Sequence, residues 1–282
     1  MRFVKLQGAG NDYLYVNVIE TPVARPEELA RRASDRHFGI GADGLILVLP
    51  AEGEGDVRMR IFNADGSEAE MCGNGVRGVA KFAADRGLAA GDTVRVETEA
   101  GLREVMLERD AQGNVIRASV SMGRPVLAPE KIPVLLEGDR VVDVPLVVGG
   151  RTLWMTCVNM GNPHAVFYAD DAEGWPLETL GPKIENHALF PERVNVHVVE
   201  VVSLGEVVMR TWERGSGPTL ACGTGASAVC VAGVLVGRTG RRILAHVPGG
   251  DLEAEWPEDR APVRLAGPIE EVFTGDWPEG DA

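Results

Sequence analysis

The chain has 282 residues, of which 45% are apolar, and carries a formal net charge of −14 at pH 7. This length favours two domains with substantial cores, and the negative charge argues against nucleic acid, whose binding needs surplus lysine and arginine facing phosphates. The apolar runs are too interrupted to span a membrane. The first residues lack the apolar stretch of a signal peptide. We therefore expect a cytoplasmic protein that acts on a small molecule.

Strand patterns and turns dominate the chain. One helix is predicted over 26–39, because Pro26 suits a first helical turn and Gly39 suits a helix end. Apolar or alternating runs predict strands over 44–50, 57–63, 92–101, 114–123, 193–202 and 205–213. Because these strands follow one another through short turns, we expect a mixed α and β fold with mostly antiparallel pairing.

A cysteine precedes a glycine-rich turn in the first half of the chain. The sequence "EMCGNGVRGVAKFAADRG" (70–87) runs from Cys72 through the turn into a helical pattern. One face of this predicted helix is apolar, whereas Arg77, Lys81 and Asp85 lie elsewhere. We therefore expect the helix to be only partly covered.

The same arrangement returns 150 residues later. The sequence "LACGTGASAVCVAGVLVGRTG" (220–240) places Cys222 before a second glycine-rich turn and a second helix. This helix is apolar on every side, so it must be surrounded by protein. It is too short to cross a bilayer, and we expect a sheet to wrap around it.

The two halves are similar beyond the cysteine turns. The segment "MRIFNADGSEAEMCGNG" (59–75) aligns without a gap with "MRTWERGSGPTLACGTG" (209–225). Earlier in each half, "GAGND" (8–12) corresponds to "MGNPH" (160–164). Because a strand, a loop of equal length, a cysteine turn and a helix all recur together, we infer an internal duplication.

A cysteine at a helix start is a candidate catalytic group. The N–H groups and positive dipole end of a helix N-terminus favour the thiolate of a cysteine, whose ordinary pKa is about 8.5. The glycines after Cys72 and Cys222 leave bare backbone that can approach an anion. If the halves face each other, the two thiols suit removal of a proton from one face of a carbon and its return to the other. We expect no organic cofactor and no metal, since the cysteines lack zinc-site spacing.

These motifs resemble the diaminopimelate epimerase family along essentially the whole chain. The resemblance is carried by "KLQGAGNDYLYV" (5–16), "RHFGIGADGLILV" (36–48), "RIFNADGSEAEMCGNGVRG" (60–78), "MGNPHAVFYADD" (160–171), "FPERVNVHVVE" (190–200), "ERGSGPTLACGTGASA" (213–228) and "VPGGDLEAEW" (247–256). It implies a cofactor-independent enzyme that interconverts LL- and meso-diaminopimelate, in lysine and peptidoglycan precursor biosynthesis. It also implies an α+β fold of two pseudo-symmetric domains, each of mostly antiparallel strands wrapped around a central helix.

The resemblance assigns roles to individual residues. It implies that Cys72 and Cys222 are the acid and base, exchanging roles with the direction of the reaction. It implies that His164 and Glu213 tune the pKa values of these thiols. The implied substrate-binding residues are Asn11, Asn63, Gly73, Asn74, Asn162, Asn195, Glu213, Arg214, Gly223 and Thr224. Among these, Arg214 suits the distal carboxylate, because its planar guanidinium binds a carboxylate through two hydrogen bonds.

Two other functions stay open. A proline or hydroxyproline racemase of the same fold would also use two thiols, but such enzymes usually carry histidine where this chain has Asn74, and they lack the "ERGSG" segment containing Arg214. A non-catalytic relative could bind an anion at the glycine turns. Loss of a cysteine would be the usual mark of that relative, whereas Cys72 and Cys222 are both present.

The remaining expectations concern organisation and chemistry away from the site. The first domain is expected to comprise 1–122 with 268–282, and the second 123–267. The family resemblance implies a homodimer. At Gly44, some family members carry a substrate-contacting glutamine, so the affinity is expected to differ. Cys157 and Cys230 match no catalytic motif, and oxidation of Cys72 with Cys222 would inactivate the enzyme reversibly.

Overall fold

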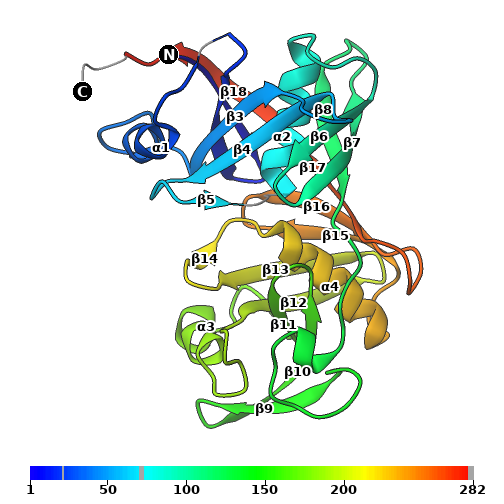
Figure 1. Ribbon diagram of the computed structural model, residues 1–282. Coiled ribbons are helices and arrows are strands. Elements are labelled where there is room, and N and C mark those ends of the chain that lie inside the picture. The colour runs from blue at the N-terminus through cyan, green and yellow to red at the C-terminus, as the bar shows by residue number, and fades with distance from the viewer. Residues whose placement is uncertain (21, 70–72, 279–282) are drawn as a thin grey trace. The chain divides into compact units, whose positions relative to one another are not determined.

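The computed structural model describes residues 1–20, 22–69 and 73–278 (Figure 1). The chain divides into two compact units. Unit 1 comprises Met1–Val120 together with the segment that starts at Gly267, and unit 2 comprises Ser121–Ala266. Among the described residues, no helix is both long and apolar enough to cross a membrane.

Unit 1 contains two α-helices and nine strands within the described residues. Its strands are β1 (Arg2–Gly8), β2 (Asn11–Asn17), β3 (Gly44–Pro50), β4 (Val57–Asn63), β5 (Glu68–Ala69), β6 (Thr93–Thr98), β7 (Gly101–Arg109), β8 (Val115–Ser121) and β18 (Glu270–Asp276). Its helices are α1 (Pro26–Ser34) and α2 (Gly73–Asp85).

The described residues of unit 2 also form nine strands and two α-helices, together with one 3-10 turn. Its strands are β9 (Val144–Val148), β10 (Arg151–Asn159), β11 (Pro163–Tyr168), β12 (Asn195–Ser203), β13 (Glu206–Glu213), β14 (Gly217–Thr219), β15 (Arg242–Val247), β16 (Gly250–Glu255) and β17 (Arg264–Pro268), the last of which leads back to unit 1. Its helices are a 3-10 turn (Pro129–Lys131), α3 (Leu177–Glu185) and α4 (Gly223–Leu235).

The strand order is the same in both units. Unit 1 runs β18-β1-β2-β3-β4-β6-β7-β8 with β5 beside β4, and unit 2 runs β9-β10-β11-β12-β13-β15-β16-β17 with β14 beside β13. Among the described strands, two pairs in each unit are parallel: β2 with β3 and β4 with β6 in unit 1, and β11 with β12 and β13 with β15 in unit 2. A parallel pair needs a long crossover, and each of the four crossovers contains one α-helix. The duplication inferred from the sequence therefore extends to the four described α-helices and their flanking strands.

One helix lies at the centre of each unit. In unit 1, α2 contacts β1, β2, β3, β4, β6 and β7. In unit 2, α4 contacts the equivalent strands β10, β11, β12, β15 and β16 (Figure 1). The residues of α4 from Gly225 to Gly233 are all buried, as its apolar sequence requires. The predicted α+β class, with mostly antiparallel strands around a central helix, is confirmed.

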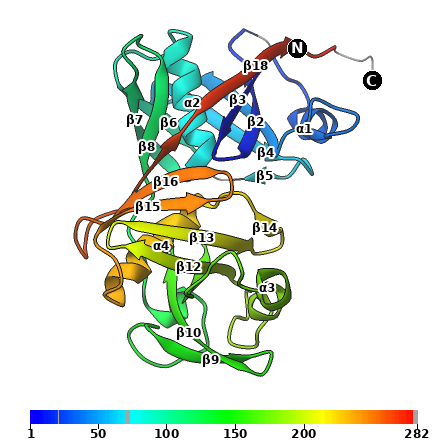
Figure 2. The same ribbon diagram turned by 180° about the vertical axis from the view of Figure 1, so that it is seen from behind.

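The other helix of each unit packs on the outer face of the strands (Figure 2). Helix α1 contacts β3 and β4, and α3 contacts β9, β12, β13 and β14. Strand β3 is buried on both faces: Leu45 and Leu47 join the core under α1, and Ile46 between them points to the opposite face. This explains why β3 reads as a continuous apolar run.

Two helix predictions need correction. Helix α1 ends at Ser34 and not at Gly39, because the carboxylate of Asp35 accepts hydrogen bonds from the backbone N–H groups of His37 and Phe38 and starts a turn instead. Helix α3 was not predicted from the sequence, in which Gly181 and Pro182 interrupt the helical pattern.

The expectation that α2 is only partly covered is also wrong. Its residues from Asn74 to Ala83 are all buried, including Arg77 at 0% and Lys81 at 7% exposure. The ammonium of Lys81 donates to the carbonyl of Val115 at 2.8 Å and pairs with Asp85 at 2.9 Å. A cation can lie inside the unit because oxygen partners are supplied there.

Candidate active site

Cys222 lies at the start of the buried helix α4. Its backbone is extended (φ −135°, ψ 108°), and its carbonyl accepts the first helical hydrogen bond, from the N–H of Ala226 at 2.9 Å. The side chain is 5% exposed, and Sγ lies 3.5 Å from Oγ1 of Thr224. The thiol is therefore placed where the N–H groups and dipole of a 13-residue helix favour negative charge.

The other two described cysteines are in different surroundings. Cys157 and Cys230 are buried in β10 and α4, and burial raises the pKa of each thiol to about 12. Such thiols stay protonated at neutral pH and act as packing groups. Of the three described cysteines, Cys222 alone begins a helix.

A buried imidazole lies against the first turn of α4. A Cβ atom added to Gly225 would lie 2.3 Å from Cε1 of His197, so only glycine lets the ring approach this closely. His197 bonds in turn to Oγ1 of Thr211 at 2.9 Å and to His164 at 2.9 Å. His164 completes the series with a 2.7 Å contact from Nε2 to Oδ1 of Asn162. Two predicted site residues, Asn162 and His164, are thus bonded directly to each other and are linked to the start of α4 through His197, which the sequence did not single out.

Glu213 ends β13, and Arg214 begins the loop after it. The carboxylate of Glu213 accepts a 2.7 Å hydrogen bond from the hydroxyl of Thr219. The backbone N–H of Arg214 donates to Oδ1 of Asn195 at 2.9 Å, and Nδ2 of Asn195 donates to the carbonyl of Pro163 at 2.8 Å. Asn195 therefore ties the start of β11 to the backbone that presents Arg214.

Helix α3 supports the same loop from the other side. The buried carboxylate of Glu185 accepts hydrogen bonds from the indole of Trp212 at 2.7 Å and from the backbone N–H of Gly215 at 2.8 Å. The guanidinium of Arg193 is the third donor, at 3.3 Å. Glu185 thus bonds to Trp212, just before the "ERGSG" segment, and to Gly215 within it. This role could not be predicted from the sequence, because helix α3 itself was not predicted.

Unit 1 holds the second group of predicted residues. Cys72 lies outside the described residues, and α2 begins directly after it at Gly73. The amide of Asn74 donates to Oδ1 of Asn11 at 3.3 Å, and Nδ2 of Asn11 donates to the carboxylate of Asp43 at 2.6 Å. Oδ1 of Asn74 accepts a 2.5 Å hydrogen bond from the buried guanidinium of Arg77. These contacts bring Asn11 and Asn74 together at the start of α2 and fix the direction of both amides.

Asp43 belongs to an ion network under Asn11. Arg36 bridges the carboxylates of Asp12 at 2.7 Å and Asp43 at 2.9 Å, and Lys5 pairs with Asp12 at 2.8 Å. Burial acts to raise the pKa of the Asp12 carboxyl, but hydrogen bonds from Arg36 and Lys5 outweigh it and lower that pKa. Asp43 anchors the Asn11 amide through their 2.6 Å hydrogen bond.

Asn63 and Gly44 lie side by side in the β3–β4 register. The amide of Asn63 donates to Oγ of Ser67 at 2.9 Å, within the turn after β4. A Cβ atom on Gly44 would lie 2.2 Å from the carbonyl oxygen of Phe62. A larger residue at Gly44 would require the local backbone to move, so this chain is built around the absence of a side chain at that position.

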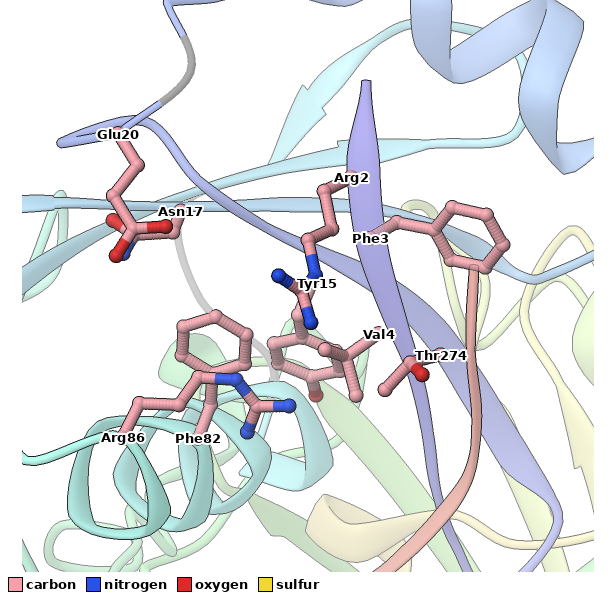
Figure 3. A pocket seen from close by; sticks show the side chains of 9 residues that line it. All are labelled: Arg2, Phe3, Val4, Tyr15, Asn17, Glu20, Phe82, Arg86 and Thr274. Atoms are coloured by element: carbon pink, nitrogen blue, oxygen red, sulfur yellow. The ribbon is translucent and has the colours of Figure 1, made fainter. Parts of the chain in front are cut away.

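A surface pocket of unit 1 contains none of the predicted site residues. It is lined by Arg2, Phe3, Val4, Tyr15, Asn17, Glu20, Phe82, Arg86 and Thr274 (Figure 3). Arg86 stacks on Phe82 at 4.3 Å and pairs with Glu271 at 3.1 Å, so its charge is already balanced by protein groups. Among the described residues, no cluster of three or more His, Cys, Asp or Glu side chains could hold a metal.

The chain matches known proteins over almost its whole length. The diaminopimelate epimerase family model matches residues 3–128 and 156–270. A diaminopimelate epimerase of Acetivibrio thermocellus is 49% identical, covering 98% of both chains. One of Moorella thermoacetica is 50% identical, covering 99% of both.

Solved structures with lower identity share the fold. A Bacillus anthracis phenazine biosynthesis protein of the PhzF family has a TM-score of 0.69 and 16% identity, covering 98% of both chains. A probable proline racemase of Agrobacterium radiobacter has a TM-score of 0.67 and 16% identity, covering 99% of this chain and 93% of that one. At this identity the likeness shows the fold alone.

Proposed function

Because the chain belongs to the diaminopimelate epimerase family, we propose that it interconverts LL-2,6-diaminopimelate and meso-2,6-diaminopimelate, within lysine and peptidoglycan precursor biosynthesis. The observation that carries this proposal is the thiol of Cys222 at the positive end of the buried helix α4. Cys72 directly precedes the equivalent helix α2 in the sequence, at an offset of 150 residues. A pair of thiols at equivalent helix starts matches a reaction that inverts one carbon.

The proposed reaction is a proton exchange at the α-carbon. In one direction the thiolate of one cysteine removes the α-proton, and the thiol of the other cysteine gives a proton to the opposite face of the carbon. In the reverse direction the two sulfurs exchange roles, so each turnover leaves one thiol and one thiolate. No organic cofactor takes part in this scheme.

The intermediate of this reaction carries negative charge on the α-carboxylate. Helix starts present N–H groups to such charge, and the bare backbone at Gly73 with Asn74, and at Gly223 with Thr224, would supply them. Stabilisation of the developing enediolate by these donors is the main contribution we assign to the backbone. This stabilisation depends on backbone N–H groups in the glycine turns and not on particular side chains.

The residues that the family resemblance implies would bind the rest of the substrate. We assign substrate contacts to the side-chain amides of Asn11, Asn63, Asn74, Asn162 and Asn195. Hydrogen bonds to protein groups orient Asn11, Asn74, Asn162 and Asn195. Arg214 would bind the distal carboxylate through two hydrogen bonds. Glu213 and His164 would set the electrostatic surroundings of the thiols. His164 would do so as a neutral ring, because burial, with His197 and Arg214 nearby, lowers its pKa.

Proton NMR in D2O tests the proposal. Reduced protein is incubated with LL-diaminopimelate, and parallel samples contain the Cys72→Ala, Cys222→Ala and Cys230→Ala variants. We expect deuterium at one α-position and formation of the meso isomer with the wild type and with Cys230→Ala, and no conversion with the other two. Folded Cys222→Ala protein that still epimerises the substrate would contradict the two-thiol mechanism.

A parallel sample of L-proline separates the main alternative. Exchange of proline alone would keep the fold and the paired thiols but move the substrate to a cyclic monoacid. Exchange of neither substrate by reduced, folded protein would favour a non-catalytic anion-binding role.

We also propose that the enzyme is a cytoplasmic homodimer. Size-exclusion chromatography with light scattering measures the mass in solution directly. A mass near 30.1 kDa, that of one chain, would contradict the homodimer.

A further inference from the structure

Four side chains of unit 2 form one hydrogen-bonded series across three neighbouring strands. We call it the histidine chain; it consists of Asn162, His164, His197 and Thr211. Asn162 lies just before β11, His164 in β11, His197 in β12 and Thr211 in β13. His197 and Thr211 are directly opposite in the β12–β13 register. The consecutive contacts measure 2.7, 2.9 and 2.9 Å.

Both rings of the histidine chain are inside the unit. His164 and His197 are 0% exposed, and their ring centroids are 5.0 Å apart. Burial lowers the pKa of His197 to about 3. Burial also lowers the pKa of His164, and the charged forms of His197 and Arg214 lower it further. Each ring is therefore neutral at pH 7, with one N–H donor and one bare nitrogen.

The contact with Asn162 shows the direction of the whole series. Oδ1 of Asn162 can only accept, so Nε2 of His164 carries the proton. The bare Nδ1 of His164 then accepts from Nε2–H of His197. The bare Nδ1 of His197 accepts in turn from the hydroxyl of Thr211. Every donor meets an acceptor in this order.

The position of His197 is fixed by packing as well as by hydrogen bonds. Its ring lies against Gly225 in the first turn of α4, where a Cβ atom would be 2.3 Å from Cε1. The hydroxyl of Thr211 bonds to Nδ1, the ring atom next to Cε1. The His197 imidazole therefore connects the start of α4 to the side chain of His164.

We propose that His197 is a positioning residue: with Thr211, it holds His164 as the Nε2–H tautomer and so orients the amide of Asn162 with Oδ1 toward the ring. The NH2 group of Asn162, on a half-buried side chain, is then left to donate to the substrate. This inference rests on the proposed function for its kinetic consequence. It also gives His164 a further role: both of its ring nitrogens are engaged, and it acts on the substrate through Asn162.

Matched substitutions at Thr211 test the proposal without removing a ring. Thr211→Val keeps the shape of the side chain but deletes the hydroxyl, and Thr211→Ser keeps the hydroxyl. At His197, Gln offers a carbonyl to Thr211 and an N–H to His164, whereas Phe offers neither. We expect KM for LL-diaminopimelate to rise about tenfold in Thr211→Val and His197→Phe, with kcat changed less than about threefold. Thr211→Ser and His197→Gln should stay within about threefold of the wild type.

The tautomers are measured independently of activity. Nitrogen-15 NMR of labelled protein at pH 7.5, without substrate, distinguishes protonated from bare ring nitrogens. We expect protonated Nε2 and bare Nδ1 in both His164 and His197, with mixed signals for His164 in the His197→Phe variant. Protonated Nδ1 in both rings, which reverses the series, would overturn the proposal, as would an unchanged KM in folded Thr211→Val.

Failure of the proposed function and failure of the histidine-chain assignment give different results. Wild-type protein that does not convert LL-diaminopimelate would overturn the proposed function. The nitrogen signals of that same sample would still uphold or overturn the assigned tautomers. A general loss of folding in the variants would lower kcat in proportion to the active fraction and leave KM unchanged, which is a result against positioning by His197.

Discussion

Removal of the Glu185 carboxylate should loosen the loop that presents Arg214. In Glu185→Ala, the indole N–H of Trp212 and the backbone N–H of Gly215 both lose their acceptor. The guanidinium of Arg193 loses its partner as well, although its side chain is 53% exposed and water can replace that contact. The effect should therefore come mainly from the two neutral donors.

The size of the effect follows from the burial of those donors. A buried donor without a partner costs about 1–3 kcal/mol. Because Trp212 is half-buried and Gly215 is exposed, we take the lower end for each and expect roughly 2 kcal/mol in the free energy of unfolding. For a chain of 282 residues that lowers the melting temperature by roughly 3–4 °C. Glu185→Gln keeps one acceptor and should lose about half as much.

Thermal unfolding followed by circular dichroism measures this loss. Glu178→Ala is the matched control, since Glu178 lies on the same helix and pairs with Arg210 at 2.7 Å but is 60% exposed. The control should change the melting temperature by no more than about 2 °C. KM should rise several-fold in Glu185→Ala only. Equal melting temperatures for the two variants would refute the assigned role of the buried carboxylate.

Three further outcomes follow from the structure. Gly225→Ala should displace the His197 ring, since the added Cβ would lie 2.3 Å from Cε1. Steady-state kinetics should then show a loss of at least about tenfold in kcat/KM. Gly205→Ala is the control and should keep full activity, because its Cβ would lie 3.9 Å from the nearest neighbouring atom. Hydrogen bonds to Glu206 and then Asp251 raise the pKa of His246 above its ordinary 6.5, so the stabilisation from His246 is fully present below pH 6.5 and is lost as the pH rises through the higher folded value. Urea titrations should show this slope between pH 6 and 8 in the wild type, and an identical slope in His246→Gln would contradict it. Iodoacetamide at pH 8 should leave Cys157 and Cys230 unlabelled in the native protein, because burial raises both thiol pKa values to about 12, and should label them after denaturation; native labelling seen by mass spectrometry would contradict the packing role.

Most of the fold was predictable because the duplicated strand, loop, cysteine turn and helix are visible as similar sequence segments, 59–75 and 209–225. The glycine turn before α4 and the apolar sequence of that helix predicted both its start and its burial. Helix α3 escaped prediction because Gly181 and Pro182 break the helical pattern, and tertiary packing on β12 and β13 stabilises it nevertheless. The equivalence of α3 with α1 emerges only from the strand order.

The site was predictable where chemistry shows in the residue type, and not where it depends on pairing between strands. Cys222 and Asn162 belong to recognisable turns. His197 sits inside an alternating apolar run, "RVNVHVVE", where the pattern indicates only a strand. Asp43 and Arg77 likewise gain their roles from partners distant in the sequence. No spacing rule identifies such partners before the register of the sheet is known.

The return of the chain to unit 1 has a consequence for its synthesis. Strand β1 pairs with β2, close behind it, and with β18, which follows all of unit 2 along the chain. A ribosome therefore makes the continuous Ser121–Ala266 segment before the strand that completes unit 1. We expect unit 2 to finish folding first, because β18 is synthesised after it. Until β18 is made, one edge of β1 stays unpaired and can pair with strands of other nascent chains. A truncation just before Glu270 should therefore leave this edge of β1 unpaired even though all of unit 2 has been made.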